Sequence, residues 1–154
     1  MTGIYFNDPS FPHQPYADAV QSAFEAAGMG AVEYYTHDTE RGLGISYLWR
    51  PSAAKEGGTS LQPAEGTYLG HGVMLLWTEE QGWGFNALDA ESDPAWDSED
   101  PVPVAKFADL DDLVEFARLL LAGEPDDASA SEREWQHADA LRAALRDRAG
   151  RVSR

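Results

Sequence analysis

Residues 73–88, VMLLWTEEQGWGFNAL, decide how this chain folds, because they contain its strongest strand pattern and a turn signal. Every position from Val73 to Trp77 is apolar, so both faces of the predicted strand, residues 68–77, carry apolar side chains. A strand of this kind belongs in the middle of a sheet. Residues 78–82 end in glycine and lead into a second strand at 83–88, which predicts a β-hairpin.

Before the hairpin, the pattern predicts one helix and two shorter strands. The helix begins at Pro15, has apolar residues at three- and four-residue spacing, and ends at Gly28. The strands are predicted near residues 32–35 and 44–49. Residues 50–66 are rich in glycine, proline and small polar residues, which is typical of a long loop.

After the hairpin, the sequence predicts a short edge strand at residues 102–107 and two more helices. Asp109 is the expected N-cap of the first of these helices, which ends at Gly123. The segment from Ser131 to Glu134 has the spacing of a capping box, so the last helix is expected to open there. Trp135 would lie on its apolar face, either docked on the body or directed to a partner.

This order predicts an α+β fold: an antiparallel meander sheet of three to five strands with helices packed on one face, plus a C-terminal helix. Residues 1–124 are expected to form an acidic α+β domain. Residues 125–130 would be a linker, and residues 131–154 an arginine-bearing helix. Trp49, Trp77 and Trp83 are assigned to the core.

Charge is distributed unevenly along the 154 residues. Residues 1–130 carry 23 acidic and 5 basic side chains, giving −18, whereas residues 131–154 carry 4 acidic and 6 basic ones, giving +2. The total of −16 would repel nucleic acids and anionic membranes. The sequence therefore predicts no direct nucleic-acid or membrane binding, and favours a basic protein partner.

Composition excludes several chemistries. The chain has no cysteine, which removes disulfides, cysteine nucleophiles and thiolate metal sites, and fits a cytoplasmic location. The N-terminus has neither the basic start nor the apolar run of a signal peptide. No apolar stretch approaches the ~20 residues that a membrane span needs. Dinucleotide, P-loop and nucleophile-elbow motifs are also missing, so no cofactor and no catalytic residue are predicted.

The loop from Asp89 to Asp100 is the main candidate site. Its carboxylates have the spacing of calcium ligands, but Pro94 occupies the position where a calcium loop needs glycine, so no specific calcium site is expected. Trp96 lies between these acids and would be a natural anchor for a basic partner, although it could equally fold over the sheet. The predicted partner-binding residues are Asp89, Glu91, Asp93, Trp96, Asp97, Glu99 and Asp100.

The four histidines show no metal-binding spacing, so no metal site is predicted and each is read as a surface or hydrogen-bonded residue. An alternative site remains open. A cleft near Tyr35, His37, Tyr47 and His71 could bind a small ligand or carry out acid–base chemistry.

The stretch from Val73 to Gly123 also supports a resemblance. The segments LLWTEEQGW (75–83) and FADLDDLVEFAR (107–118), with Pro15-Tyr16 in the opening helix, resemble a group of small actinobacterial proteins of unknown function. The resemblance covers roughly residues 15–123 and implies an N-terminal helix, a short sheet and an Ala/Leu-rich C-terminal helix in a bacterial protein. It lends no active site.

Two functions follow. The first is a non-enzymatic acidic module that binds a basic protein surface, regulates it, and in a special case imitates nucleic acid. The second is a small enzyme or ligand-binding domain that uses the Tyr35–His71 cleft. The first is favoured because no catalytic constellation is recognisable.

Overall fold

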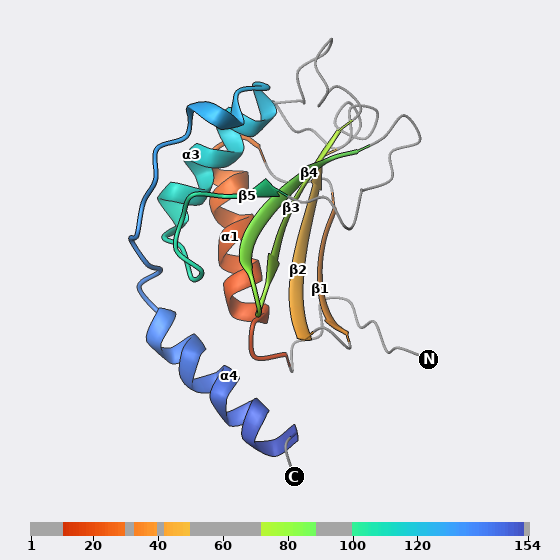
Figure 1. Ribbon diagram of the computed structural model, residues 1–154, viewed down its shortest axis with the longest axis vertical. Helices are drawn as coiled ribbons and strands as arrows, with labels where there is room; N and C mark the ends of the chain where they lie inside the picture. The colour runs from red at the N-terminus through yellow and green to blue at the C-terminus, as the bar shows by residue number, and fades with distance from the viewer. Residues whose placement is uncertain (1–10, 30–32, 40–41, 50–71, 89–99, 153–154) are drawn as a thin grey trace.

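The computed structural model of the 154-residue chain describes residues 11–29, 33–39, 42–49, 72–88 and 100–152. Figure 1 shows one sheet with helices α1 and α3 on one side of it, and helix α4 leading away toward the C-terminus. The helices are α1 (Gln14–Ala26), α3 (Leu110–Leu121) and α4 (Ala138–Val152), with a short 3-10 helix η1 (Pro125–Asp127). The α+β architecture expected from the sequence is confirmed.

The sheet is a five-stranded antiparallel meander in the order β1-β2-β3-β4-β5. Its strands are β1 (Glu33–Thr39), β2 (Gly42–Trp49), β3 (Val73–Thr78), β4 (Gly82–Ala87) and β5 (Asp100–Pro101). The predicted hairpin is the β3–β4 pair, in which Thr78 lies opposite Gly82. Strand β3 lies in the centre of the sheet and its residues Val73–Trp77 are all buried, as their two apolar faces require.

Glycine at position 82 is a conformational requirement of the hairpin. Its φ is 79°, in the left-handed region that a residue with a Cβ adopts at a cost. The three-residue loop between Thr78 and Gly82 is closed by the Gln81 amide, which donates to Thr78 Oγ1 at 3.0 Å. This is the hairpin class in which a left-handed glycine follows a turn.

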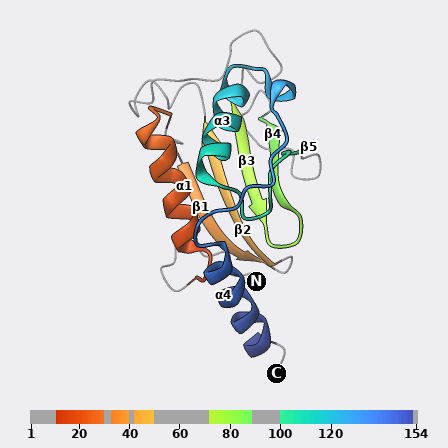
Figure 2. The same ribbon diagram turned by 90° about the vertical axis from the view of Figure 1, so that its left-hand side faces the viewer.

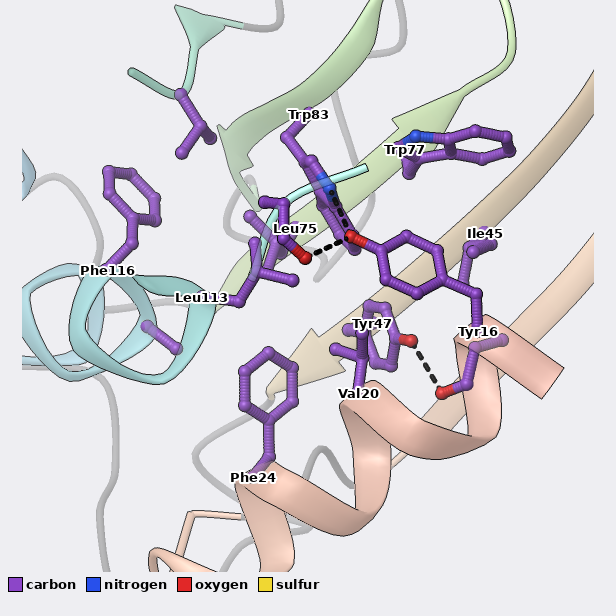
Figure 3. Close-up of a cluster of buried hydrophobic side chains, with 14 of the residues drawn as sticks. Tyr16, Val20, Phe24, Ile45, Tyr47, Leu75, Trp77, Trp83, Leu113 and Phe116 are labelled. Carbon is purple, nitrogen blue, oxygen red and sulfur yellow. Dashed lines mark hydrogen bonds between the residues drawn. The ribbon is translucent and has the colours of Figure 1, made fainter. Parts of the chain in front are cut away.

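Helices α1 and α3 cover the same face of the sheet, as Figure 2 shows from the helix side. Alternation along the strands sends Ile45, Tyr47 and Trp49 of β2 toward these helices, where all three are buried. Figure 3 shows how Tyr16 of α1 points into this core, where its hydroxyl accepts a hydrogen bond from Trp83 Nε1. The same hydroxyl donates to the Ala108 carbonyl at 2.8 Å.

The expected edge strand at residues 102–107 is wrong. The fifth strand is the pair Asp100–Pro101, and the chain then turns, with the Val104 amide donating to the Val102 carbonyl at 2.8 Å. Proline at 101 and 103 explains the difference, since neither residue has an N–H to continue a ladder. Val102 makes the last bond to β4, from its amide to the Trp83 carbonyl at 3.1 Å.

The predicted capping box at residues 131–134 is also wrong, because α4 begins at Ala138. Residues 133–135 instead run antiparallel to residues 107–109. The Trp135 amide donates to the Phe107 carbonyl at 2.8 Å, and the Asp109 amide to the Arg133 carbonyl at 3.1 Å. The Ser131 hydroxyl, expected to cap the helix, donates to Asp112 Oδ2 at 2.6 Å. A partner distant in the sequence has displaced the local one.

Asp109 occupies the N-cap position of α3, as expected, but its side chain makes no capping hydrogen bond. Its carboxylate lies 3.8 Å from the guanidinium of Arg133 instead. The glycines predicted to end α1 and α3, Gly28 and Gly123, both have positive φ, 76° and 80°. The ends of both helices are therefore correctly placed.

Candidate interaction site

The predicted partner loop lies almost wholly outside the described residues. Asp89, Glu91, Asp93, Trp96, Asp97 and Glu99 belong to the part of the chain that the structure does not describe. Asp100 is described: it is exposed, begins β5 and lies opposite Phe85 of β4. The role of the loop therefore stays a prediction.

A second concentration of acid occurs on and after α3. Residues 109–132 contain eight acidic side chains and one basic side chain. Those exposed around α3 and η1, here called the acidic face, are Asp111, Glu115, Glu124, Asp126 and Asp127. Carboxylates in the first turn of α3 favour the helix, since they face the positive end of its dipole. Those after its last turn gain nothing from that dipole, so helix stability does not explain them.

Asp112 binds a basic segment of the same chain, residues 133–148. Arg133 donates to both carboxylate oxygens of Asp112, a geometry that matches the planar guanidinium to the carboxylate. The hydrogen bond from Arg133, supported by that from Ser131, holds the pKa of Asp112 below its usual value. The Asp112 side chain is only 13% exposed, so it is a shielded arginine site.

Trp135 anchors this basic segment on the body. The indole is 9% exposed, and its ring centroid lies 4.8 Å from that of Tyr16. Ala138, Leu141 and Leu145 of α4 belong to the same buried cluster. The predicted alternative that Trp135 projects toward a partner is thus not what the structure shows.

Two arginines of α4 continue the contact. Arg142 lies over the Phe107 ring, 5.0 Å from its centroid, and pairs with Glu134 and Asp139. Farther along the helix, Arg148 donates to Asp38 of β1 at 2.6 Å. The basic segment is therefore held by one buried indole and by arginine–carboxylate pairs at both ends.

A groove of about 330 Å³ runs beside the Arg133–Asp112 pair. Val104, Phe116, Leu119 and Ala128 supply apolar walls. Asp112, Glu115 and Asp127 line it with carboxylates, and Arg133 is the one cation among its described lining residues. Its volume is at the small end of the range for ligand sites, about 300–1,000 Å³.

The alternative cleft is not assembled as expected. Tyr47 is fully buried on the helix-covered face, where its hydroxyl donates to the Ala17 carbonyl at 2.8 Å, and burial raises its pKa. Tyr35 and His37 pair with Ser46 and Gly44, so they lie on the other face of the sheet. His71 lies outside the described residues.

His37 does form a polar pair on that other face. Its Nε2 lies 3.1 Å from Ser46 Oγ, and burial lowers its pKa. The imidazole occupies the space above Gly44, where a Cβ would be 2.2 Å from His37 Cε1. A hollow of about 250 Å³, lined in part by Thr78, Gly82 and Asp100, lies farther across the sheet.

His13 is a buried residue that sequence reasoning did not single out. Its side chain is inaccessible, stacks on Trp77 with a centroid distance of 6.0 Å, and places Nε2 at 2.9 Å from the Gly44 carbonyl oxygen. Because a carbonyl only accepts, Nε2 carries the proton. Nδ1 has no hydrogen-bond partner in the described structure, and burial lowers the pKa of His13 to about 4.

Within the described ranges, no group of three or more His, Asp or Glu side chains could hold a metal ion. No helix there is long and apolar enough to cross a bilayer. No family model, curated protein or solved structure matches the chain. The resemblance to small actinobacterial proteins therefore stays a prediction.

Sequence reasoning missed the acidic face and its arginine. Asp112 had a sufficient local explanation as a first-turn acid of α3, so its pairing with Arg133 was not expected. Eight acids against one base in residues 109–132 was the available signal. Nothing in the local sequence pairs Asp112 with Arg133, since that contact depends on how the segment after α3 folds back.

Proposed function

We propose that this protein is a non-enzymatic acidic module that binds a basic surface of a partner protein and thereby regulates it. In a special case, its carboxylates stand in for nucleic-acid phosphates and compete for a DNA-binding protein. The proposal includes a cytoplasmic location and a bacterial origin. It includes no cofactor, metal or direct contact with nucleic acid.

One observation carries this proposal: the acidic body already binds a basic, tryptophan-bearing segment, its own residues 133–148. That contact combines an aromatic anchor, Trp135, with arginine–carboxylate pairs at Asp112 and Asp38. Buried aromatics and charge-matched arginines are also what hold intermolecular interfaces. The body thus supports the kind of recognition that the proposal needs.

The acidic face would meet the partner together with the loop at residues 89–100. Among the carboxylates of the acidic face, all of them described residues, only Glu115 forms an ion pair, with Arg118 at 3.8 Å, and both of those side chains are mostly exposed. Such an exposed pair is worth little. The carboxylates of the face can therefore exchange into contacts with a partner at low cost.

The experiment is a titration of the full chain with a labelled 20-residue peptide rich in lysine and arginine and containing one tryptophan. An acidic peptide and a DNA duplex serve as negative controls. We expect saturable binding of the basic peptide alone. Saturable binding of the duplex, or no saturable binding of the basic peptide, would contradict the proposal.

A pair of charge-matched variants separates a surface from mere net charge. The double variant Glu115→Gln, Asp126→Asn changes the acidic face, whereas Glu25→Gln, Glu80→Gln changes exposed acids elsewhere. Both raise the net charge by two. We expect the first to weaken binding more, and equal effects would show that no localised face is involved.

The pair His37–Ser46 favours a second candidate, a small-ligand site on the sheet face opposite the helices. Tyr35 and His37 remain in this candidate and Tyr47 is excluded from it, because Tyr47 points into the core. A ligand found by thermal-shift screening, whose effect is lost in Ser46→Ala, would support it. A ligand effect unchanged by that substitution would place the site elsewhere.

A further inference from the structure

The groove between α3 and residues 127–133 differs from the rest of the acidic face because it has walls of two kinds. Phe116 is buried at its base, with Val104 and Leu119 half-buried beside it. Glu115 and Asp127 are exposed at its rim. An arginine has the complementary form, an aliphatic stem that packs on apolar surface and a charged head that stays near solvent.

The side chains that line the groove carry an excess of negative charge, which favours the binding of a second cation. Three carboxylates line it, Asp112, Glu115 and Asp127, against the single guanidinium of Arg133. Arg133 is bound at Asp112 and extends toward Asp109, 3.8 Å away. Arg133 forms no ion pair with Glu115 or Asp127 in the described structure, and Glu115 makes only its exposed pair with Arg118 at 3.8 Å.

We infer that this groove is an arginine-binding site, which takes one arginine side chain from an extended basic segment of the partner beside the chain's own Arg133. The incoming stem would pack on Phe116 and Leu119, and its guanidinium would pair with Glu115 and Asp127. This inference rests on the proposed function and assigns it a place. Arginine is preferred over lysine because its planar fork binds carboxylates with two parallel hydrogen bonds.

The test uses the full chain and a labelled peptide, Gly-Gly-Arg-Leu-Arg-Gly-Gly, with lysine and citrulline versions of it. Citrulline keeps the shape of arginine and removes its charge. We expect the arginine peptide to bind most tightly and the citrulline peptide least. In NMR spectra recorded during the titration, the backbone amide signals of Leu119 and Ala128 should shift, while that of Glu80 should not.

Two kinds of groove variant have matched controls. Glu115→Gln with Asp127→Asn removes the rim charges, and Glu25→Gln with Glu80→Gln removes the same charge elsewhere. Ser129→Trp fills the groove without changing charge, and Ser22→Trp places the same bulk on the exposed side of α1. Both groove variants should weaken arginine-peptide binding about tenfold, and both controls less than about twofold.

Each result has a distinct meaning. If the arginine peptide binds but the groove variants and the controls lose equal affinity, the arginine site is not in this groove. The proposed function is then not contradicted. If the lysine peptide binds as tightly as the arginine peptide, the specific guanidinium site is also wrong. If neither this peptide nor the longer basic peptide binds the unaltered chain, the proposed function itself fails.

Discussion

At the scale of single residues, His13 shows how burial fixes a protonation state. The ring lies within the core, donates from Nε2 to the Gly44 carbonyl, and leaves Nδ1 without a hydrogen-bond partner in the described structure. A proton added at Nδ1 would create a buried charge and an unpaired donor. Desolvation is accordingly the largest cause of its lowered pKa.

We predict that the protein loses stability as the pH falls from 6.5 toward 4. The pKa of His13 is depressed from 6.5 to about 4, so the unfolded chain binds a proton in this range that the folded chain does not. Stability is thus fully present above pH 6.5 and is lost below it. The full shift corresponds to about 3 kcal/mol, and the lowered pKa of His37 acts in the same direction.

Urea unfolding at pH 7.0, 5.5 and 4.5 measures this loss. The variant His13→Gln should be less stable at pH 7.0 but should depend less on pH, because its amide does not titrate. His137→Gln changes an exposed position, and its free energy of unfolding should depend on pH as that of the unaltered protein does. An unaltered slope in His13→Gln would show that other groups cause the acid sensitivity.

At the scale of elements, what could be predicted from sequence was what local chemistry determines. The unbroken apolar run from Val73 to Trp77 predicted the central strand, and glycine at 82 predicted the hairpin. Apolar spacing and terminal glycines predicted α1 and α3. The capping box predicted at Ser131 was wrong because the hydroxyl of this residue binds Asp112, which is 19 residues away in the sequence. A capping motif can be read locally, but the fold-back that overrides it cannot.

The basic segment gives a prediction at the same scale. Trp135→Ala should lower the free energy of unfolding by about 3 kcal/mol, because it removes a nearly buried indole packed against Tyr16. Trp135→Phe should retain part of that stability. Urea denaturation measures both, and a change below about 1 kcal/mol in the alanine variant would contradict the anchoring role.

Truncation after Glu124 tests the predicted domain boundary. The shortened chain should unfold cooperatively but at a lower urea midpoint, since it loses the buried side chains of Trp135, Leu141 and Leu145. Its far-ultraviolet spectrum should retain the sheet signal. A chain without a cooperative transition would show that residues 1–124 do not fold on their own and that the predicted boundary is wrong.

For the whole molecule, the uneven charge can be counted from the sequence, but the sequence does not show where the charged segments lie in the fold. Counting charges identifies an acidic body and a basic end. It does not reveal that the basic end is bound to the body through Asp112 and Asp38, or that a groove lies beside the first of these pairs. Both depend on contacts between distant segments.

Electrostatic attraction between the acidic body and a basic partner can be measured as the association rate of the full chain with the basic, tryptophan-containing peptide at increasing ionic strength. We expect the rate to fall steeply with added salt, as it does for electrostatically steered encounters. Neutralising Asp93, Asp97, Glu99 and Asp100 together should lower mainly the association rate. Trp96→Ala should raise mainly the dissociation rate. An affinity that is unchanged by added salt and by both variants would show that the protein does not bind its partner through the loop and the acidic face.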